Sequence, residues 1–249
     1  RVGEAAGRFL TMIKVAISGC CGKMGAMILG LALKDKNFKV VSIFEKTGHP
    51  SVGSEVSGLK VSDATQDIKN ADVLIEFTSP ESTVEHLGAC LKYNRAMVIG
   101  TTGLSDEHIE QIVSGAEEIP IVFSPNMSVG VNWLFKLVRE ASQKLSGEYN
   151  TSITEAHHVH KKDSPSGTAK KIAQIVRDER GENIVGTITS IRKDEIVGDH
   201  EVVFEGPFDM IRLAHSAKAR DIFAHGALVA AQWVIGKKNG LYGMEDIVR

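Results

Sequence analysis

Short, nearly continuous apolar runs alternate with amphipathic segments over the first half of the chain. The run at residues 13–17 is rich in β-branched residues and ends at a glycine turn, after which apolar residues follow a helical spacing at Met24, Met27, Ile28 and Leu31. Similar apolar runs recur with helical segments between them, at residues 38–44, 73–77, 96–100 and 121–123. Apolar strands that alternate with helices are typical of a parallel sheet covered on both faces. The pattern predicts a doubly wound α/β sheet.

The second half has a different pattern. Residues 129–145 form a helical stretch, followed by a strand at 151–156, a polar loop and a helix at 168–180. Three further strands are expected at 187–192, 200–204 and 210–215, before a last helix at 221–235. Turn residues separate these strands, which favours an α+β domain with a mixed or antiparallel sheet. We expect the first domain at residues 12–127 and the second at 128–235.

Composition narrows the classes of partner. The formal net charge is −2 and the pI is about 6.5, so no general basic field attracts nucleic acid or an anionic membrane. No apolar run approaches the ~20 residues that span a bilayer. Three cysteines are too few and too uneven for a disulfide framework. We expect a soluble, cytoplasmic protein that binds neither nucleic acid nor membrane.

A glycine turn of spacing GxxGxxG follows the first predicted strand and opens the first helix, where a Rossmann-like fold binds a pyrophosphate. Its residues are Gly19, Cys20, Cys21, Gly22, Lys23, Met24 and Gly25. Glycines also serve tight packing, but Glu45 at the end of the second strand adds a carboxylate that can accept from a ribose. Lys46 can pair with a 2′-phosphate or be a solvated surface charge. Both NADH and NADPH are therefore admissible.

Two later loops follow predicted strands of the same sheet. In an open parallel sheet, ligands sit at the carboxyl ends of the strands. Small and polar residues there suit a nicotinamide and its ribose, although ordinary loop chemistry accounts for them equally well. The residues concerned are Gly100, Thr101, Thr102, Ser124, Pro125, Asn126 and Met127.

A loop rich in histidine and lysine, EAHHVHKKDSPSGTA, joins a predicted strand to a predicted helix. Histidine titrates near neutral pH, and a lysine in a confined cationic site can act as an acid, so the loop offers proton donors. Gly167 and Thr168 begin the helix, where backbone N–H groups and a hydroxyl can bind a carboxylate. The sequence predicts proton donors beside an anion site.

The same loop is compatible with two further roles. Its histidines and Asp163 could bind zinc, with His157 and His160 in H-x-x-H spacing, or the loop could be a solvated basic segment. We expect no metal, because proton transfer and carboxylate binding use the same nitrogen atoms that would coordinate an ion.

These motifs together resemble the 4-hydroxy-tetrahydrodipicolinate reductase family, also called dihydrodipicolinate reductases, of the bacterial diaminopimelate and lysine pathway. The resemblance extends from Met12 to Val248 through VAISGCCGKMG, EFTSPESTVEH, MVIGTTGL, FSPNMSVGVN, EAHHVHKKDSPSGTA, DEIVGDHEVVF and FAHGALVAAQW. It implies that segment 236–249 returns to the nucleotide-binding domain. It further implies a homotetramer built by the sheet of the second domain.

The resemblance also implies a reaction. NADH or NADPH gives hydride to C4 of a cyclic imine derived from 4-hydroxy-tetrahydrodipicolinate, and the products are tetrahydrodipicolinate, the oxidised nucleotide and water. Matching positions make His157 and Lys161 the acid/base pair, while His158, Gly167 and Thr168 hold the dicarboxylate. The glycine turn through Met24, the Glu45–Lys46 pair and the two later loops would contact the nucleotide.

The sequence departs from the family in two places. Cys21 stands where many members have glycine, and the segment between Arg180 and Thr187 is shorter than the usual loop. Two other functions remain to be distinguished. One is a dehydrogenase for a different small acid, which the fold alone allows. The other is a nucleotide-sensing regulator that binds the nucleotide without turnover. The presence of both His157 and Lys161 disfavours this second function.

Overall fold

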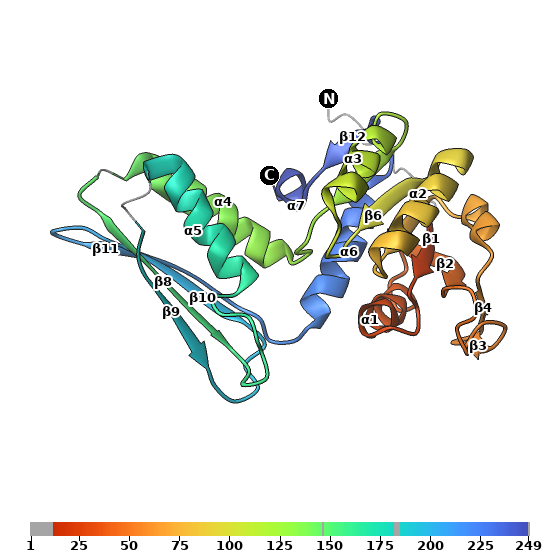
Figure 1. Cartoon of the computed structure of the whole chain (residues 1–249), viewed down its shortest axis with the longest axis horizontal. Helices are drawn as coiled ribbons and strands as arrows, with labels where there is room; N and C mark the ends of the chain where they lie inside the picture. The colour runs from red at the N-terminus through yellow and green to blue at the C-terminus, as the bar shows by residue number, and fades with distance from the viewer. Residues whose placement is uncertain (1–11, 146, 182–184, 249) are drawn as a thin grey trace, which may run out of the picture. The chain divides into compact units, whose positions relative to one another are not determined.

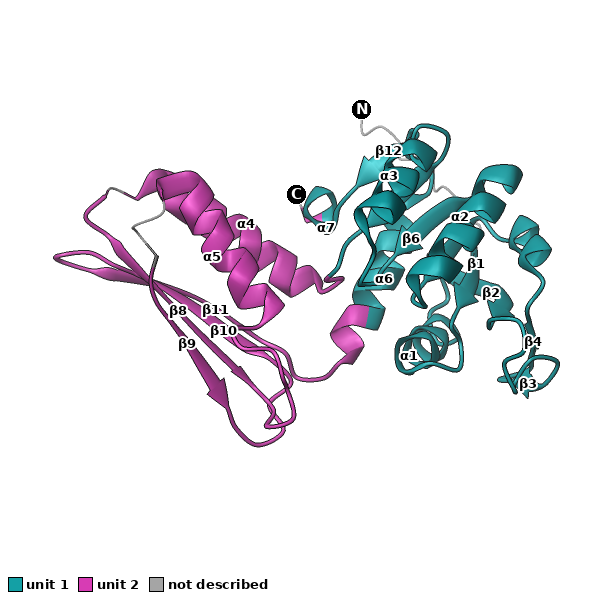
Figure 2. Cartoon of the chain, in the orientation of Figure 1, with its two compact units in different colours: residues 1–125, 224–247 teal, residues 126–223, 248–249 magenta. Residues whose placement is uncertain are grey.

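The computed structural model describes residues 12–145, 147–181 and 185–248. It forms two compact units (Figures 1 and 2). Of the described residues, unit 1 comprises those from Met12 to Pro125 together with Ala224–Ile247, and unit 2 comprises those from Asn126 to Phe223 together with Val248. Unit 1, coloured teal in Figure 2, is therefore built from two separate stretches of the chain.

Unit 1 contains an eight-stranded sheet of order β12-β7-β6-β5-β1-β2-β4-β3. All neighbouring strands are parallel except β3 and β4, which form an antiparallel pair. Every residue of β5 and β6 is buried, as expected for central strands covered on both faces. The strands are β1 (Ile13–Ser18), β2 (Phe38–Phe44), β3 (Glu55–Val56), β4 (Leu59–Ser62), β5 (Val73–Glu76), β6 (Ala96–Ile99), β7 (Pro120–Phe123) and β12 (Gly240–Tyr242).

Helices cover this sheet, and local sequence explains where two of them begin. Ser79 caps α2 by accepting from Ser82 N–H, and Ser105 caps α3 in a capping box with His108. The helices of this unit are α1 (Lys23–Ala32), the 3₁₀ helix η1 (Thr65–Asn70), α2 (Pro80–Tyr93), α3 (Asp106–Gly115), most of α6 (Asp221–Val234) and α7 (Met244–Ile247).

Unit 2 packs two helices against a four-stranded sheet of order β11-β10-β8-β9 (Figure 1). β9 is parallel to β8, whereas β10 is antiparallel to both β8 and β11, so the sheet is mixed. Alternate residues of β8 and β10 are buried, so one face of these strands forms the core. The elements are α4 (Val129–Lys144), β8 (Asn150–His157), α5 (Gly167–Arg180), β9 (Val185–Arg192), β10 (Asp199–Glu205) and β11 (Met210–Ser216).

The predicted doubly wound sheet and the mixed second sheet are both present. The short strands β3, β4 and β12 were not predicted, because runs of two to four residues have little hydrophobic pattern. Among the described residues, no helix has the length and apolar content needed to cross a bilayer.

The structure divides the chain differently from the sequence at helix α6. The expected second domain extended to residue 235, but Ala224–Val234 belongs to unit 1. Small residues dominate the buried surface of this helix and allow close packing. Its buried residues are Ala224, Gly226, Ala227, Leu228, Ala230, Ala231 and Val234. The shortened segment near residue 183 falls partly on residues 182–184, outside the described ranges.

Candidate active site

The glycine turn connects β1 to α1 in a conformation that only small residues permit. Gly19 has φ +72°, and a Cβ added at Gly25 would lie 1.9 Å from the Gly19 carbonyl oxygen. Gly22 is the N-cap residue of α1 and has no side chain to accept from the first N–H groups of the helix. These donors and the positive end of the helix dipole suit a pyrophosphate.

Glu45 reaches this turn from the end of β2. Its Oε1 accepts from the Cys21 N–H at 2.8 Å, while Lys46 beside it is exposed. The sequence predicted a ribose partner for Glu45. In the structure, its carboxylate accepts a hydrogen bond from the backbone of the turn. Cys21 thus provides a backbone donor to Glu45, and its side chain is exposed.

The loop after β6 is also closely packed. A Cβ added at Gly100 would lie 2.1 Å from the Phe77 ring, so a side chain there would displace the ring. Thr101 is buried, and its hydroxyl oxygen accepts from the Thr78 N–H at 3.1 Å. Thr102 is exposed and free of this packing constraint.

Most of the residues predicted to contact the nucleotide lie at one edge of the sheet in unit 1. They follow β1, β2, β6 and β7, which are parallel, so their carboxyl ends lie at the same edge. Ser124 and Pro125 belong to this group, whereas Asn126 and Met127 belong to unit 2. The residues in unit 1 fit a nicotinamide nucleotide, because tightly packed glycines, helix N–H donors and a carboxylate follow the same strands.

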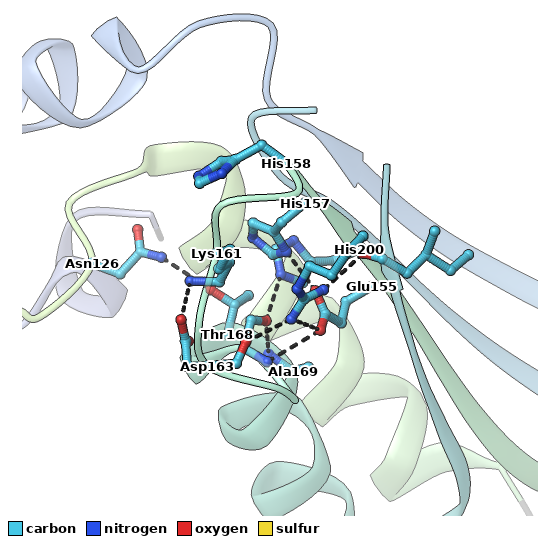
Figure 3. A network of polar contacts seen from close by, with 12 residues as sticks. Asn126, Glu155, His157, His158, Lys161, Asp163, Thr168, Ala169 and His200 are labelled. Atoms are coloured by element: carbon cyan, nitrogen blue, oxygen red, sulfur yellow. Dashed lines mark hydrogen bonds and ion pairs between the residues drawn. The ribbon is translucent and has the colours of Figure 1, made fainter. Parts of the chain in front are cut away.

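In unit 2, His157 is the last residue of β8 and is held by Glu155 on the same face of the strand (Figure 3). The Nδ1 atom of His157 donates to Glu155 Oε2 at 2.5 Å. The other oxygen, Oε1, accepts from Arg192 Nη2 at 2.9 Å and from the Ser166 N–H at 3.3 Å. Glu155 is completely buried, and each of its oxygens accepts from at least one donor.

These contacts set the charges in the cluster. Burial alone would raise the pKa of Glu155, but hydrogen bonds from Arg192, Ser190 and His157 lower it to about 2. Burial lowers the pKa of His157, and the charges of Lys161 and Arg192 lower it further, against the opposing effect of Glu155. Around neutral pH, Glu155 is therefore a carboxylate beside a largely neutral His157.

Lys161 lies in the loop between β8 and α5 and is held by an ion pair. Its Nζ lies 2.8 Å from Asp163 Oδ1, and hydrogen bonding from Lys161 lowers the pKa of Asp163. Arg192 Nη2 also donates to the Asp163 carbonyl oxygen at 2.6 Å and so connects the loop to Glu155. The loop places an ammonium group and an imidazole in the same cluster.

The N-terminus of α5 completes this cluster. Helix α5 begins at Gly167, one residue earlier than predicted, and its cap is Ser166, whose hydroxyl accepts from the Ala169 N–H at 3.2 Å. The Thr168 hydroxyl is thus not the cap, and it accepts from Asn126 Nδ2 at 3.4 Å. A Cβ added at Gly167 would have no described atom within 4 Å apart from its chain neighbours and the backbone of its own helix, so packing against other elements does not require glycine there.

His158 follows His157 and contacts a different residue. Its Nε2 lies 3.4 Å from Arg220 Nη2. In the part of the chain that the structure describes, its Nδ1 is buried and has no hydrogen-bond partner. A buried polar atom without a partner is costly, so His158 is suited to bind a ligand oxygen.

The sequence reasoning missed three of the groups around His157. They are Arg192 of β9, His200 of β10, whose Nε2 lies 3.2 Å from Ser166 Oγ, and the carboxylate of Glu155, which the motif contained without a role. Alternation along a strand could have identified Glu155, because residues 155 and 157 share a face. Nothing in the local sequence places Arg192 or His200 opposite them.

The structure also locates potential metal ligands. Among the described residues, three potential ligand atoms lie within 4.8 Å of one another only at Cys20, Cys21 and Glu45 in unit 1, not in the histidine loop. Burial and the neighbouring Cys21 raise the pKa of the Cys20 thiol to about 12, which disfavours the thiolate that a metal would need.

Comparisons with known proteins agree for both halves of the chain. Residues 13–127 match the family model described as dihydrodipicolinate reductase, N-terminus, and residues 130–248 match the model for its C-terminus. The 4-hydroxy-tetrahydrodipicolinate reductase of Syntrophotalea carbinolica is 38% identical, over 95% of this chain and 99% of that protein. The reductase of the same name from Syntrophus aciditrophicus is 36% identical, over 95% and 98%.

A solved structure is similar over the same extent. The dipicolinate-bound dihydrodipicolinate reductase from Paenisporosarcina sp. TG-14 has a TM-score of 0.82 and 26% identity, covering 95% of this chain and all of that one. A diaminopimelate dehydrogenase from C. glutamicum, at 13% identity and a TM-score of 0.60, shares the fold alone. The chain belongs to the dihydrodipicolinate reductase family.

Proposed function

We propose that this protein reduces 4-hydroxy-tetrahydrodipicolinate to tetrahydrodipicolinate, with loss of water, in diaminopimelate and lysine biosynthesis. The observation that carries the proposal is the cluster in unit 2, where a buried carboxylate holds a largely neutral histidine and also accepts from the Ser166 N–H at the start of helix α5. The first N–H groups of this helix are suited to bind an anion. The proposed substrate is the one named for the family to which both halves of the chain belong.

Unit 1 would hold NADH or NADPH, which supplies the hydride when bound. Helix α1 and the glycine turn offer donors to the pyrophosphate, and Glu45 offers an acceptor to a ribose. The loops after β6 and β7 would contact the nicotinamide end. The residues concerned are Gly19, Cys20, Cys21, Gly22, Lys23, Met24, Glu45, Lys46, Gly100, Thr101, Thr102, Ser124 and Pro125, together with Asn126 and Met127 of unit 2.

Unit 2 would bind the dicarboxylate. Backbone N–H groups of Gly167 and Thr168 at the start of α5, together with the Thr168 hydroxyl, would donate to one carboxylate. His158, whose Nδ1 lacks a partner among the described residues, would donate to a substrate oxygen. This set combines several donors with the positive end of a helix, as a bound anion requires.

His157 and Lys161 would donate and accept the protons of the reaction. Loss of water removes the C4 hydroxyl and a proton from the neighbouring carbon, so a base must take the carbon-bound proton and an acid must protonate the leaving oxygen. Hydride addition to C4 of the resulting conjugated imine then leaves negative charge that one further proton must neutralise. The low pKa of His157 keeps it mostly neutral at rest and able to pass on an acquired proton readily, while the Lys161 ammonium stabilises negative charge nearby.

We further propose a homotetramer in the cytoplasm, assembled through the sheet of unit 2. The edge strands of this sheet carry apolar side chains that are partly exposed in the single chain, among them Ile191 of β9 and Met210 of β11. Burial of such side chains favours association between copies.

A single assay tests the reaction. Purified protein is mixed with freshly generated enzymatic substrate, and the loss of reduced-nucleotide absorbance is followed. We expect turnover with this substrate and none with simple 2-oxo acids. Turnover of another acid alone would instead support a different dehydrogenase, and nucleotide binding without any turnover would support a regulator.

The choice of nucleotide is tested at Lys46. A lysine that pairs with the 2′-phosphate matters only when that phosphate is present, so Lys46→Ala should raise KM for NADPH and leave KM for NADH nearly unchanged. Equal changes in both constants would identify Lys46 as an ordinary surface charge.

The proposed mechanism uses no resident metal. Protein purified without chelator should contain no stoichiometric zinc, and dialysis against EDTA should leave its activity unchanged. About one zinc per chain, lost together with activity on dialysis, would contradict the roles given to His157 and His158.

A further inference from the structure

Glu155 is the only carboxylate that the structure places in hydrogen-bond contact with His157 among the described residues, and its surroundings leave it one orientation. Its Oε1 is occupied by Arg192 Nη2 and the Ser166 N–H, at 2.9 and 3.3 Å, so Oε2 is the oxygen that faces His157 (Figure 3). A carboxylate can only accept. His157 Nδ1, 2.5 Å away, must therefore carry a hydrogen.

The opposite side of the imidazole is kept open. A Cβ added at Gly198 would lie 3.0 Å from His157 Nε2 and 3.4 Å from its Cδ2, so a side chain at this position would crowd the ring. The ring of His200 stands edge-on to that of His157, with their centroids 5.1 Å apart. Nε2 is thus the ring nitrogen that makes no hydrogen bond to the buried carboxylate.

We infer that Glu155, oriented by Arg192, is a positioning residue that fixes the proton of neutral His157 on Nδ1 and leaves Nε2 to exchange a proton with the substrate. This inference rests on the proposed role of His157. Neutral imidazole has one donor and one acceptor nitrogen, and the partner of one nitrogen decides the state of the other. After Nε2 takes up a proton, the buried carboxylate stabilises the imidazolium.

Arg192 makes a substitution at Glu155 informative. The guanidinium has only donors, so in Glu155→Gln it should retain the amide oxygen and turn the amide NH₂ toward His157 Nδ1. That contact forces the hydrogen of neutral His157 onto Nε2. The side chain keeps its shape and burial, but the imidazole acquires the opposite tautomer and loses its carboxylate.

The expected result is a kinetic change with a specific form. Glu155→Gln should lower kcat by about 10²-fold or more, since both the position of the proton and the stabilising charge are lost. KM for the reduced nucleotide should stay within about twofold. Glu155→Asp, which keeps the charge at a greater distance, should recover part of kcat.

The pH profile separates positioning from a merely structural role. Loss of the carboxylate should lower the pKa of His157 further, so the limb of the kcat profile that reports this group should move to more acidic pH. The other charged or titratable groups that face His157 are Lys161 and Asp163 of the loop, Arg192 of β9 and His200 of β10. The charge of Glu155 also raises the pKa of His200, so the substitution should lower that pKa as well.

The chain provides a matched control. Glu195 pairs with His160 at 4.0 Å, but both side chains are highly exposed, so Glu195→Gln should leave kcat and the pH profile at parental values. Gly198→Ala should lower kcat while leaving the Glu155–His157 contact in place, because the new methyl group crowds Nε2.

The outcomes distinguish this inference from the proposed site. If His157→Gln is inactive but folded Glu155→Gln has parental kcat and pH dependence, the positioning role is wrong and the proposed site stands. If His157→Gln is itself fully active, the proposed site is wrong. Should Glu155→Gln not fold, Arg192→Gln replaces it: we expect at least a tenfold lower kcat, and parental kcat would overturn the inference.

Discussion

Among the residues that the structure describes, each unit contains one buried histidine–glutamate pair, and the two pairs are nearly identical in geometry. In unit 1, His86 Nδ1 lies 2.6 Å from Glu76 Oε2, and in unit 2, His157 Nδ1 lies 2.5 Å from Glu155 Oε2. Both glutamates are fully buried, and the exposed fractions of the two histidine side chains are 8% and 10%. Geometry of the pair alone does not distinguish them.

Their charged neighbours do. Burial lowers the pKa of His86, but the hydrogen bond and charge of Glu76 outweigh it, Glu85 adds to them, and the pKa is raised. Burial also lowers the pKa of His157, and there Lys161 and Arg192 offset the effect of Glu155, so the pKa stays low. The charged neighbours therefore differ: two cations add to the effect of burial at His157, whereas a further carboxylate, Glu85, opposes burial at His86.

This difference separates a structural pair from one suited to proton transfer. His86 belongs to α2 and Glu76 to β5, so their charged contact connects a helix to the central sheet, with the Thr78 hydroxyl also donating to Glu76. A histidine that holds its proton this firmly stabilises the fold. A histidine whose pKa is lowered by burial and by nearby cations releases its proton more readily. The functional assignment therefore depends on the charges around the pair.

The largest expected effect is on the stability of unit 1. His86→Gln leaves the Glu76 carboxylate buried without its charged partner, so the free energy of unfolding should fall by about 3–5 kcal/mol. Urea unfolding at fixed protein concentration measures it. The exposed counterpart His160→Gln is the control and should unfold like the parent. A stable His86→Gln would show that the pair is not structural.

His157→Gln should affect activity instead. We expect kcat to fall by about 10²-fold with a modest change in KM, because general acid/base catalysis contributes roughly that factor. Steady-state kinetics measure both constants. The folded fraction of His86→Gln should keep its kcat, and equal losses of kcat in the two variants would remove the functional distinction between the pairs.

A smaller effect is expected beside the second pair, at the N-terminus of α5. Because Ser166 is the cap, Thr168→Val should leave α5 intact and remove one donor to a charged ligand. Binding of 2,6-pyridinedicarboxylate should weaken by about 1.5–3 kcal/mol, roughly ten- to a hundredfold, in calorimetry. Nucleotide affinity should be unchanged. Unaltered dicarboxylate binding would place the substrate elsewhere.

The smallest expected effect is on the pH dependence of stability, where the two pairs should differ in sign. His86 has a raised pKa, so its contribution is fully present below its ordinary pKa of 6.5 and is lost as pH rises through the folded pKa. His157 has a lowered pKa, so its folded environment opposes protonation and destabilises the protein as pH falls below 6.5. His86→Gln should therefore lower the free energy of unfolding most at acidic pH.

Unfolding of His86→Gln, His157→Gln and the parent at about pH 5 and about pH 9 tests these signs, with the His157→Gln cost expected to be larger at the higher pH. The same pH trend in both variants would mean that the pKa values of His86 and His157 are not shifted in opposite directions.

The sequence by itself determined the order of the main strands and helices, the glycine turn after β1 and the loop that carries His157. These features are local. Apolar runs such as residues 73–77 predict buried strands because all their side chains need to leave water, and the turn at Gly19 needs a residue that tolerates positive φ. Local sequence could not predict that most of α6 belongs to unit 1, because its small apolar residues could have packed against either unit.

Only the tertiary structure decided what surrounds His157. In unit 2, β9 pairs with β8 so that Arg192 stands opposite His157, and β10 pairs so that His200 stands opposite Glu155. A shift of one residue in either register would turn these side chains to the other face of the sheet. Register follows from packing of the whole sheet against α4 and α5, so a local stretch of sequence gives the histidine but not the charges that set its pKa.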